Sequence, residues 1–350
     1  ITAEDIDLFL DYLSQKPCTG SKAYNKKPSD VPRLSSPTIK KIYNALMVGF
    51  PTAKQWRYVT EIPEVAAPSE KYKKRNYWQP EQIYDFLKMI EDDPMLHLAV
   101  HIGFVCSLRA GEVAGIDINQ IDLKDKSLWI KRILQRVSDE SLATLPREEI
   151  IHVFPKKKAT SKSSLILKAP KTEDSYRKLY LTTPLVEEIK RRLDEIAENK
   201  AVFGPEYHDQ GLLLCYADGS PIEPKSIGDT FKDTQQRLKI EDMLEFQGLR
   251  KSGQMHKVRL SNNNYQLVAE AAGQSPEVLM SNYNEAQESE KRALSEKVEE
   301  SFYPSSTRKQ PVESEKKIFE AQDLLFKVQE DPDLSQQLLR LLLSSAISRL

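Results

Sequence analysis

Six side chains in four short segments have the types and spacing needed for chemistry on a phosphate ester. They are Arg109, Lys171, Gln247, Arg250, Gln274 and Tyr283. A guanidinium group pairs with two phosphate oxygens through parallel hydrogen bonds and stabilises the negative charge that gathers there during attack. A tyrosine hydroxyl has an ordinary pKa of about 10 and is a poor nucleophile unless positive charge lies nearby. Arginines combined with a tyrosine are therefore suited to attack on a phosphodiester.

These residues have distinct expected roles in such a reaction. Arg109 and Arg250 would supply the positive charge that activates Tyr283. The departing 5′-oxygen must receive a proton, and Lys171 is expected to deliver it as general acid. The glutamines Gln247 and Gln274 can donate hydrogen bonds to phosphate oxygens, but an amide cannot exchange a proton near neutral pH.

The first two segments resemble parts of the tyrosine recombinase (phage integrase) family. Residues 107–116, which read SLRAGEVAGI, resemble the stretch around the family's first catalytic arginine, with Arg109 where one helix ends and the next begins. The pair Lys171-Thr172, followed by Ser175 and Arg177, resembles the segment that delivers the catalytic lysine from a hairpin turn.

The other two segments match the same family in the same order along the chain. Gln247-Gly248-Leu249-Arg250 resembles the HxxR box that carries the second arginine. Residues 272–276, which read AGQSP, resemble the box of the nucleophile, with Tyr283 nine residues after Gln274. Gln247 stands where the family usually has His, and Gln274 where it has His or Trp. The resemblance covers residues 78–304 well and the N-terminal helices only loosely.

The resemblance implies a reaction and its partners. The product would be a 3′-phosphotyrosine linkage that conserves bond energy, so that rejoining needs no ATP, metal or other cofactor. The partner would be double-stranded DNA, bound by a homotetramer of the chain. The implied function is a site-specific recombinase or integrase of a mobile element.

Other catalytic classes lack their signatures in this sequence. There is no glycine-rich phosphate loop, no GxSxG elbow and no HExxH motif. His97 and His101 stand four apart on an expected helix, but residues 96–101 contain no carboxylate, so packing is expected rather than metal binding. Three cysteines without a CxxC pair indicate neither a disulfide framework nor a thiolate zinc site.

The elements that must position these residues predict an α+β, mainly helical chain. Residues 1–65 pattern as a small helical core-DNA-binding module, with helices expected at 3–13, 37–50 and 52–59, and residues 66–77 as a linker. Residues 78–304 form the expected catalytic domain, with helices on either side of one small antiparallel sheet. Its expected strands lie at residues 128–130, 150–154, 165–167 and 179–181.

Residues 305–350 are expected to form a linker and an amphipathic helical tail. The apolar stripes of this tail need a surface to cover, either on its own domain or on a neighbouring protomer. The second arrangement would make the tail the link between protomers of the tetramer. The first residue is Ile1 rather than Met, which suggests an N-terminal piece upstream.

The chain is basic in one stretch but not overall. The net charge is −1, but residues 145–178 contain nine Lys or Arg against four acids, a stretch that could grip phosphates. The predicted DNA-binding residues are Lys156, Lys157, Lys158, Lys162 and Arg177. With no long apolar run and no leader pattern, a soluble protein of the reducing cytoplasm, without a membrane partner, is expected.

Two other readings of the sequence remain open. The glutamines at both usual imidazole positions favour, as an alternative, a DNA-binding regulator that keeps the fold but cuts weakly or not at all. A type IB topoisomerase would share the chemistry, but it would act as a monomer and would not need the leucine-rich tail.

Overall fold

The computed structural model describes residues 1–19, 27–69, 76–156, 158–170, 176–283, 294–298 and 301. The chain divides into two units, Ile1–Gln274 and Ser275–Leu350. Among the described residues, no helix has both the length and the apolar character needed to cross a membrane.

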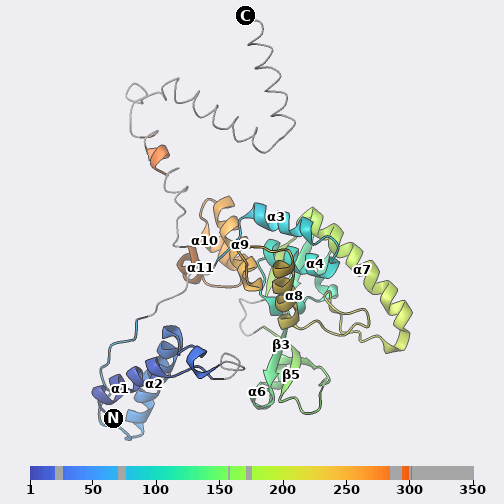
Figure 1. Ribbon diagram of the computed structural model, residues 1–350. Helices are drawn as coiled ribbons and strands as arrows, with labels where there is room; N and C mark the ends of the chain where they lie inside the picture. The colour runs from blue at the N-terminus through green and yellow to red at the C-terminus, as the bar shows by residue number, and fades with distance from the viewer. Residues whose placement is uncertain are drawn as a thin grey trace, which may run out of the picture. The chain divides into compact units, whose positions relative to one another are not determined.

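In its described residues the first unit is mainly helical, with six short strands between the helices (Figure 1). Its α-helices are α1 (Ala3–Gln15), α2 (Ser36–Gln55), α3 (Pro80–Met89), α4 (Pro94–Val105), α5 (Ala110–Ala114), α6 (Asp139–Thr144), α7 (Thr183–Phe203), α8 (Pro224–Arg237), α9 (Phe246–Leu260) and α10 (Tyr265–Ala272). Its strands are β1 (Ile121–Asp122), β2 (Ser127–Ile130), β3 (Ile133–Ser138), β4 (Ile150–Val153), β5 (Ser163–Lys168) and β6 (Arg177–Tyr180). The α+β, mainly helical class expected from the sequence is confirmed.

The N-terminal helices follow their local sequence signals. α1 begins with a capping box in which Thr2 Oγ1 accepts from the Asp5 N–H (3.1 Å) and Asp5 Oδ2 accepts from the Thr2 N–H (2.7 Å). Residues 37–50 and 52–59 were expected to form two helices. Instead α2 runs through Pro51, because its buried side chains, which include Phe50, continue one apolar face up to that position.

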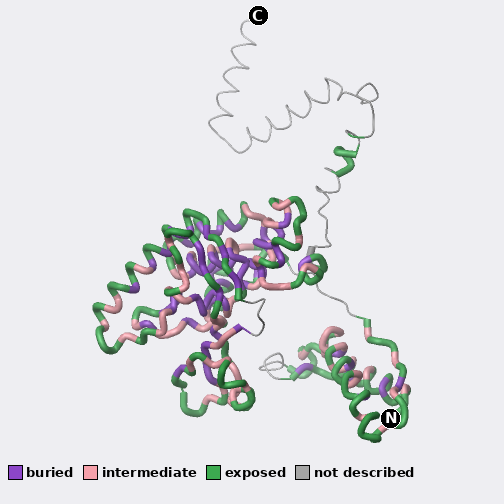
Figure 2. The backbone as a smooth tube through the Cα atoms, turned by 180° about the vertical axis from the view of Figure 1, so that it is seen from behind, coloured by how far each residue is buried: buried purple, intermediate pink, exposed green. Residues whose placement is uncertain are grey.

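In the part of the first unit that follows α2, the core is built on α4 and α9. Most residues of α4 and α9 are buried, and Figure 2 shows buried residues concentrated in the interior of the larger helical region. α4 is apolar around most of its circumference, as expected of a helix surrounded by other elements. A Cβ added at Gly253 of α9 would lie 2.1 Å from the Phe104 carbonyl oxygen of α4, so only glycine allows this approach. The two helices are thereby held in close backbone contact.

Trp78, just before α3, anchors this part of the chain to α8 and α9. Trp78 Nε1 donates to the Asp242 carbonyl oxygen (2.7 Å), and the Trp78 N–H donates to Ser252 Oγ of α9 (2.9 Å). Its ring packs at centroid distances of 5.2 Å from Phe86 and 5.9 Å from Phe231. Tertiary packing therefore connects residues near position 78 to α3, α8 and α9.

The strands form two three-stranded antiparallel sheets rather than the single sheet expected. One has the order β1-β2-β6 and the other β3-β5-β4. The chain passes from the first to the second at Arg132, whose guanidinium donates to the Gln210 and Gly211 carbonyl oxygens (3.1 and 2.9 Å) and pairs with Asp117 (3.2 Å). Arg132 thus ties the junction between the two sheets to the loop at residues 210–211.

The sheet arrangement also corrects the expected hairpin around Lys171. β5 pairs with β3 and β4, whereas β6 pairs with β2. The segment from Lys168 to Arg177 therefore joins strands of different sheets and is not a β-hairpin. In the second unit, α11 (Pro276–Tyr283) begins at the last residue of the AGQSP segment, and the expected tail at residues 305–350 lies outside the described residues.

Candidate active site

A buried carboxylate, Glu112, organises the candidate site. Its side chain is 1% exposed, and Glu112 Oε2 accepts from the Arg109 backbone N–H at 2.8 Å, closing the first turn of α5. Arg177 donates from Nη1 to Glu112 Oε1 at 3.1 Å, and Arg250 Nη1 lies 3.6 Å from Oε2. Burial alone would raise the pKa of Glu112, but the charge and hydrogen bond of Arg177, with help from Arg109 and Arg250, lower it. The group is therefore ionised and faces three arginines.

Arg250 joins three segments of the chain from a buried position on α9. It donates from Nη1 to the Ser107 carbonyl oxygen (2.9 Å) and from Nη2 to the Ala272 carbonyl oxygen (2.7 Å). Burial, with the nearby charge of Arg109, lowers the pKa of Arg250 to about 9, while Glu112 opposes the shift. The guanidinium is still charged at neutral pH, but it is poorly solvated and would gain from an anionic partner.

Gln274 completes the arginine site from the end of α10. Its Oε1 accepts from Arg250 Nη2 at 3.0 Å, which fixes the orientation of the amide. Its Nε2 is buried without a hydrogen-bond partner, so the N–H groups of the amide are left unsatisfied. Gly273 adopts the left-handed conformation (φ 60°), and a Cβ there would lie 2.8 Å from Arg177 Nη1. The glycine before Gln274 is required both for the turn and for the arginine behind it.

Ser107 and Lys257 lie in the buried part of the site. Ser107 has φ 54°, an uncommon conformation for a residue with a side chain, and is 1% exposed. Its carbonyl oxygen accepts from Arg250 and its Oγ accepts from Lys257 Nζ at 3.1 Å. Lys257 is half-buried overall, but its ammonium end is deep enough that burial lowers its pKa. Arg109, Arg177, Arg250 and Lys257 thus gather near Glu112, and we call these five residues the Glu112 cluster.

Neither a protein-family model nor a curated protein matches the sequence, but solved structures match the fold. The Tn1549 transposon integrase in complex with a circular intermediate DNA matches with a TM-score of 0.61 at 14% identity, over 85% of each chain. XerH site-specific recombinase bound to a palindromic difH substrate matches with a TM-score of 0.55 at 16% identity, over 85% of this chain and 72% of the other.

The chain has the tyrosine recombinase fold. Within this fold, the structure brings Arg109, Arg250 and Gln274 together, since Arg250 contacts Gln274 directly and shares Glu112 with Arg109. Gln247 is half-buried in the first turn of α9, three residues before Arg250 and so on the same side of the helix.

Two predicted residues of the recombinase-type site remain predictions. Lys171 lies outside the described residues, between the end of β5 and the start of β6. Tyr283 is the last residue of α11, in the second unit, and its side chain is not described. Their roles rest on the sequence segments that contain them.

The sequence did not predict three residues of the site, Glu112, Ser107 and Lys257, although the first two lie within residues 107–116. Glu112 belongs to the LRAGE segment, and its spacing from Arg109 is that of an N-cap residue and its N3 partner. Ser107 opens the same segment. Lys257 lies two helical turns after Arg250, on the same face of α9, a spacing that could have identified it.

The predicted DNA-binding residues fall in two different environments. Arg177 is buried on β6, where its Nε donates to the Ala271 carbonyl oxygen (3.0 Å) and its Nη1 to Glu112, so it belongs to the Glu112 cluster rather than to a basic surface. Lys156 pairs with Asp139 (2.7 Å), while Lys158 and Lys162 are exposed on the β4–β5 connection. Lys157 lies outside the described residues.

The environment expected for His97 and His101 needs a correction. No carboxylate is adjacent in the sequence, but Glu188 of α7 reaches both rings, with its oxygens 2.6 Å from His97 Nδ1 and 2.7 Å from His101 Nδ1. The contact spans 91 and 87 residues, so that local sequence inspection could not detect it. These histidines belong to a polar cluster between α4 and α7.

Proposed function

We propose that the chain is a site-specific DNA recombinase or integrase of a mobile element that cuts and rejoins duplex DNA through a 3′-phosphotyrosine intermediate. The Glu112 cluster supports this proposal most strongly. It gathers four cationic side chains near one carboxylate, so the site has more positive than negative charge in a poorly solvated place. A phosphodiester supplies the missing negative charge.

The orientation of individual donors supports a phosphate ligand. The Arg109 side chain is 46% exposed, so it can reach a ligand while its backbone caps α5. The Nε2 group of Gln274 offers a further donor beside Arg250. A tetrahedral oxyanion that accepts from these three groups would satisfy both the unused amide donor and the partly desolvated guanidinium.

The proposed reaction is a phosphoryl transfer in two equivalent steps. Tyr283 Oη attacks the phosphorus, the new P–O bond forms and the bond to the 5′-oxygen breaks. The tyrosine proton passes to solvent, and the 5′-oxygen receives a proton from Lys171 as general acid. In the reverse step a 5′-hydroxyl attacks the phosphotyrosine and returns its proton to Lys171, and Tyr283 leaves and takes up a proton from solvent. Arg109 and Arg250 stabilise the charge on the non-bridging oxygens in both directions.

The names of the structural relatives support the proposed DNA substrate. The Tn1549 integrase and XerH are both named as DNA complexes, and XerH as a site-specific recombinase. For this chain we propose duplex DNA as partner, a cytoplasmic location, and Lys156, Lys157, Lys158 and Lys162 as phosphate contacts. Arg177 would then act by positioning Glu112 rather than by touching DNA.

A covalent trapping experiment tests the enzyme proposal. Sequencing the duplexes that the full chain retains from a randomised library identifies a bound site. A nicked version of that duplex should then yield a protein–DNA adduct that survives denaturation. The nick lets the fragment that carries the new 5′-hydroxyl leave before it can be rejoined.

Two variants make the result decisive. Tyr283→Phe should form no adduct but retain DNA binding, and Tyr303→Phe serves as a tyrosine control that should still react. Absence of any adduct from the unmodified chain on a duplex that it binds tightly would overturn the enzyme proposal and leave DNA binding in place.

The alternative function is a recombinase-fold DNA-binding regulator with weak or no cleavage. Gln274 favours it, because its amide is held by Arg250 as a hydrogen-bonding group and cannot shuttle protons. Replacing Gln247 and Gln274 by His should raise adduct yield if the glutamines only attenuate catalysis. An unchanged zero yield in the doubly substituted protein would favour the regulator.

We also propose that residues 305–350 link protomers of a tetramer on DNA. Terminating the chain after residue 303 should then reduce the mass of the DNA complex in solution from that of the tetramer. An unchanged mass would exclude this role for the tail.

A further inference from the structure

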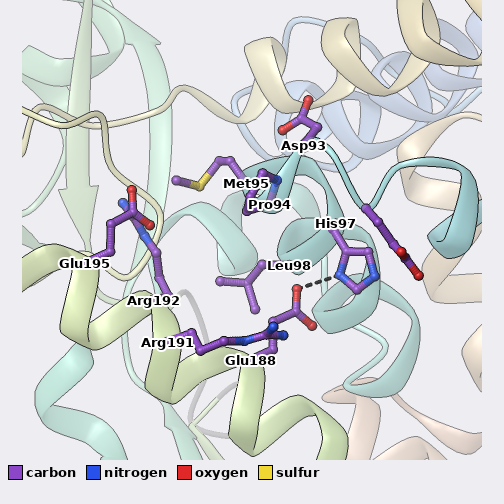
Figure 3. A pocket seen from close by; sticks show the side chains of 10 residues that line it. Asp93, Pro94, Met95, His97, Leu98, Glu188, Arg191, Arg192 and Glu195 are labelled. Carbon is purple, nitrogen blue, oxygen red and sulfur yellow. Dashed lines mark hydrogen bonds and ion pairs between the residues drawn. The ribbon is translucent and has the colours of Figure 1, made fainter.

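We propose that His97, His101 and Glu188 form a binding site for a divalent transition-metal ion of the Zn²⁺ type, separate from the Glu112 cluster. His97 and His101 lie one turn apart on α4, and Glu188 lies on α7. Both Nδ1 atoms point to the two oxygens of the same carboxylate, at 2.6 and 2.7 Å, as Figure 3 shows for His97. The three groups share no residue with the site proposed for DNA cleavage.

The three ligand groups are already gathered around one point. One nitrogen of each ring and one carboxylate oxygen lie within 4.8 Å of one another. Imidazole nitrogen and carboxylate oxygen are ordinary Zn²⁺ ligands, at about 2.0–2.2 Å from the ion. In a tetrahedral site such ligands lie roughly 3.3 Å apart. The hydrogen-bonded nitrogen–oxygen pairs, at 2.6 and 2.7 Å, are closer than this, and no separation within the ligand set exceeds 4.8 Å. Side-chain rotations would bring both nitrogens and one carboxylate oxygen to the spacing that the ion requires.

The ion would replace protons that the same atoms now share. In the metal-free arrangement each Nδ1–H donates to Glu188, and each proton occupies the space between nitrogen and oxygen. On binding, each neutral ring gives up its Nδ1 proton and takes one up on Nε2, so that Nδ1 offers its lone pair to the ion with no net loss of protons. The carboxylate exchanges two hydrogen bonds for a metal–oxygen bond.

The surroundings favour a cation and leave space for a further ligand. The cluster borders a cavity of about 840 Å³ between the start of α4 and α7, whose lining includes four carboxylates (Glu91, Asp93, Glu188 and Glu195) and two guanidinium groups (Arg191 and Arg192). Arg192 is held by Glu195 at 2.7 Å and by the Leu213 and Cys215 carbonyl oxygens, which keeps part of the positive charge engaged. Figure 3 shows His97 and Glu188 facing this cavity. Two protein nitrogens and one oxygen would leave one tetrahedral position for water.

The position of the site predicts a stabilising role. α4 leads into the Ser107–Arg109 turn, and α7 follows β6, which carries Arg177. An ion that joins α4 to α7 would hold together the two helices that adjoin the segments of Arg109 and Arg177. It would bind the folded chain in preference to the unfolded chain and raise its melting temperature.

Metal titration of the full chain, without DNA, tests this inference. After removal of metals with EDTA and dialysis, Zn²⁺ should bind saturably at one equivalent and raise the melting temperature, whereas Mg²⁺ should not. Co²⁺ at one equivalent should give the visible absorption bands of a site with nitrogen ligands and low coordination number. Because no DNA is present, the outcome does not depend on recombination.

Substitutions identify the ligands. Loss of an outer-shell partner already weakens metal binding by about 10–100-fold, so His101→Gln and Glu188→Gln should each weaken Zn²⁺ binding by at least about 100-fold. His208→Gln, which changes an exposed histidine outside the cluster, should bind like the unmodified protein. If a ligand variant does not fold, the Co²⁺ spectrum of the unmodified chain still tests whether a metal site with nitrogen ligands is present. The absence of saturable binding and of Co²⁺ bands, or full affinity in folded His101→Gln and Glu188→Gln, would overturn the site and leave a histidine–carboxylate hydrogen-bond cluster.

Discussion

At the scale of single residues, the candidate site depends on one buried negative charge among several positive ones. Glu112 holds Arg109 through its backbone and Arg177 and Arg250 through their side chains. Desolvation of this many charges is costly, and the ion pairs offset that cost only when the partners are all present. Removing one partner therefore affects both stability and the orientation of the others.

Glu112→Gln is expected to destabilise the fold by about 3 kcal/mol, because it leaves buried guanidinium groups without their counter-charge. The pKa of Glu112 is lower in the folded chain than its ordinary value, so its ion pairs contribute fully above an ordinary pKa of about 4.3. That contribution is lost as the pH falls through the lower folded-state value. Urea unfolding from pH 7 down to pH 3 should show this loss in the unmodified chain and not in Glu112→Gln. Glu187→Gln, an exposed change on α7, should leave the pH profile unaltered.

Lys257→Met is expected to move stability and activity in opposite directions. Since burial lowers the pKa of Lys257, its charge destabilises the folded state at neutral pH, and an apolar side chain of similar length removes that cost. The hydrogen bond to Ser107, worth about 1 kcal/mol, is lost at the same time. The urea midpoint should stay equal or rise, while adduct yield falls about tenfold as Ser107 and Arg250 lose support and the site loses a positive charge.

The exposed substitution Lys232→Met on α8 controls for the loss of one lysine. A Lys257→Met protein that unfolds at a clearly lower urea concentration would show that the lysine is there for stability. Normal adduct yield with unchanged stability would remove Lys257 from the site.

At the scale of elements, the site depends on how closely α9 approaches α4. Arg250, Gly253 and Lys257 lie along one side of α9, and that side faces the turn of Ser107. Gly253 has no space for a side chain, since a Cβ would also lie 2.7 Å from Ser107 Oγ. The spacing of these residues along the helix thus combines tight packing with placement of two cationic groups.

Gly253→Ala should destabilise the protein by about 1–3 kcal/mol, because the added methyl group forces α4 and α9 apart. Arg250 moves with α9, so adduct yield should fall strongly even where the chain remains folded. Gly228→Ala on α8 is the matched control, since a Cβ there meets nothing within 4 Å. That control should gain about 0.5–1 kcal/mol from the better helix propensity of alanine. Equal unfolding midpoints for the two variants would contradict the packing argument.

The elements also show what local sequence could predict. Helix starts at Thr2 and Pro80 were predictable because caps and prolines act within one turn. The division into two sheets was not, because the pairing of Ile130 with Arg177 depends on a distant segment. The same applies to Glu188, whose sequence neighbours give no sign of His97. Arg109 and Arg250 could be proposed from motifs, whereas Glu112 and Lys257 needed the packing of α5 and α9.

At the scale of the whole molecule, balanced charge and local basicity have to be reconciled. The chain has 51 Lys and Arg against 52 Asp and Glu, so its overall field does not attract DNA. The proposed DNA binding would then depend on the Glu112 cluster and on exposed lysines such as Lys158 and Lys162 of the β4–β5 connection. Such local contacts release counterions from DNA whatever the net charge of the protein.

DNA affinity should consequently fall steeply with salt despite the net charge of −1. Contacts with about 6–10 phosphates correspond to a loss of roughly 10³–10⁵ in affinity between 50 and 200 mM salt, measurable by fluorescence anisotropy with the selected duplex. Replacing Lys158 and Lys162 together by Gln should reduce the logarithmic slope by about 2, one for each phosphate contact removed. A shallow slope in the unmodified chain would contradict phosphate-driven binding altogether. A steep slope that the double substitution leaves unchanged would instead assign the contacts to other cationic residues, because the number of counterions released counts the phosphates that the protein neutralises.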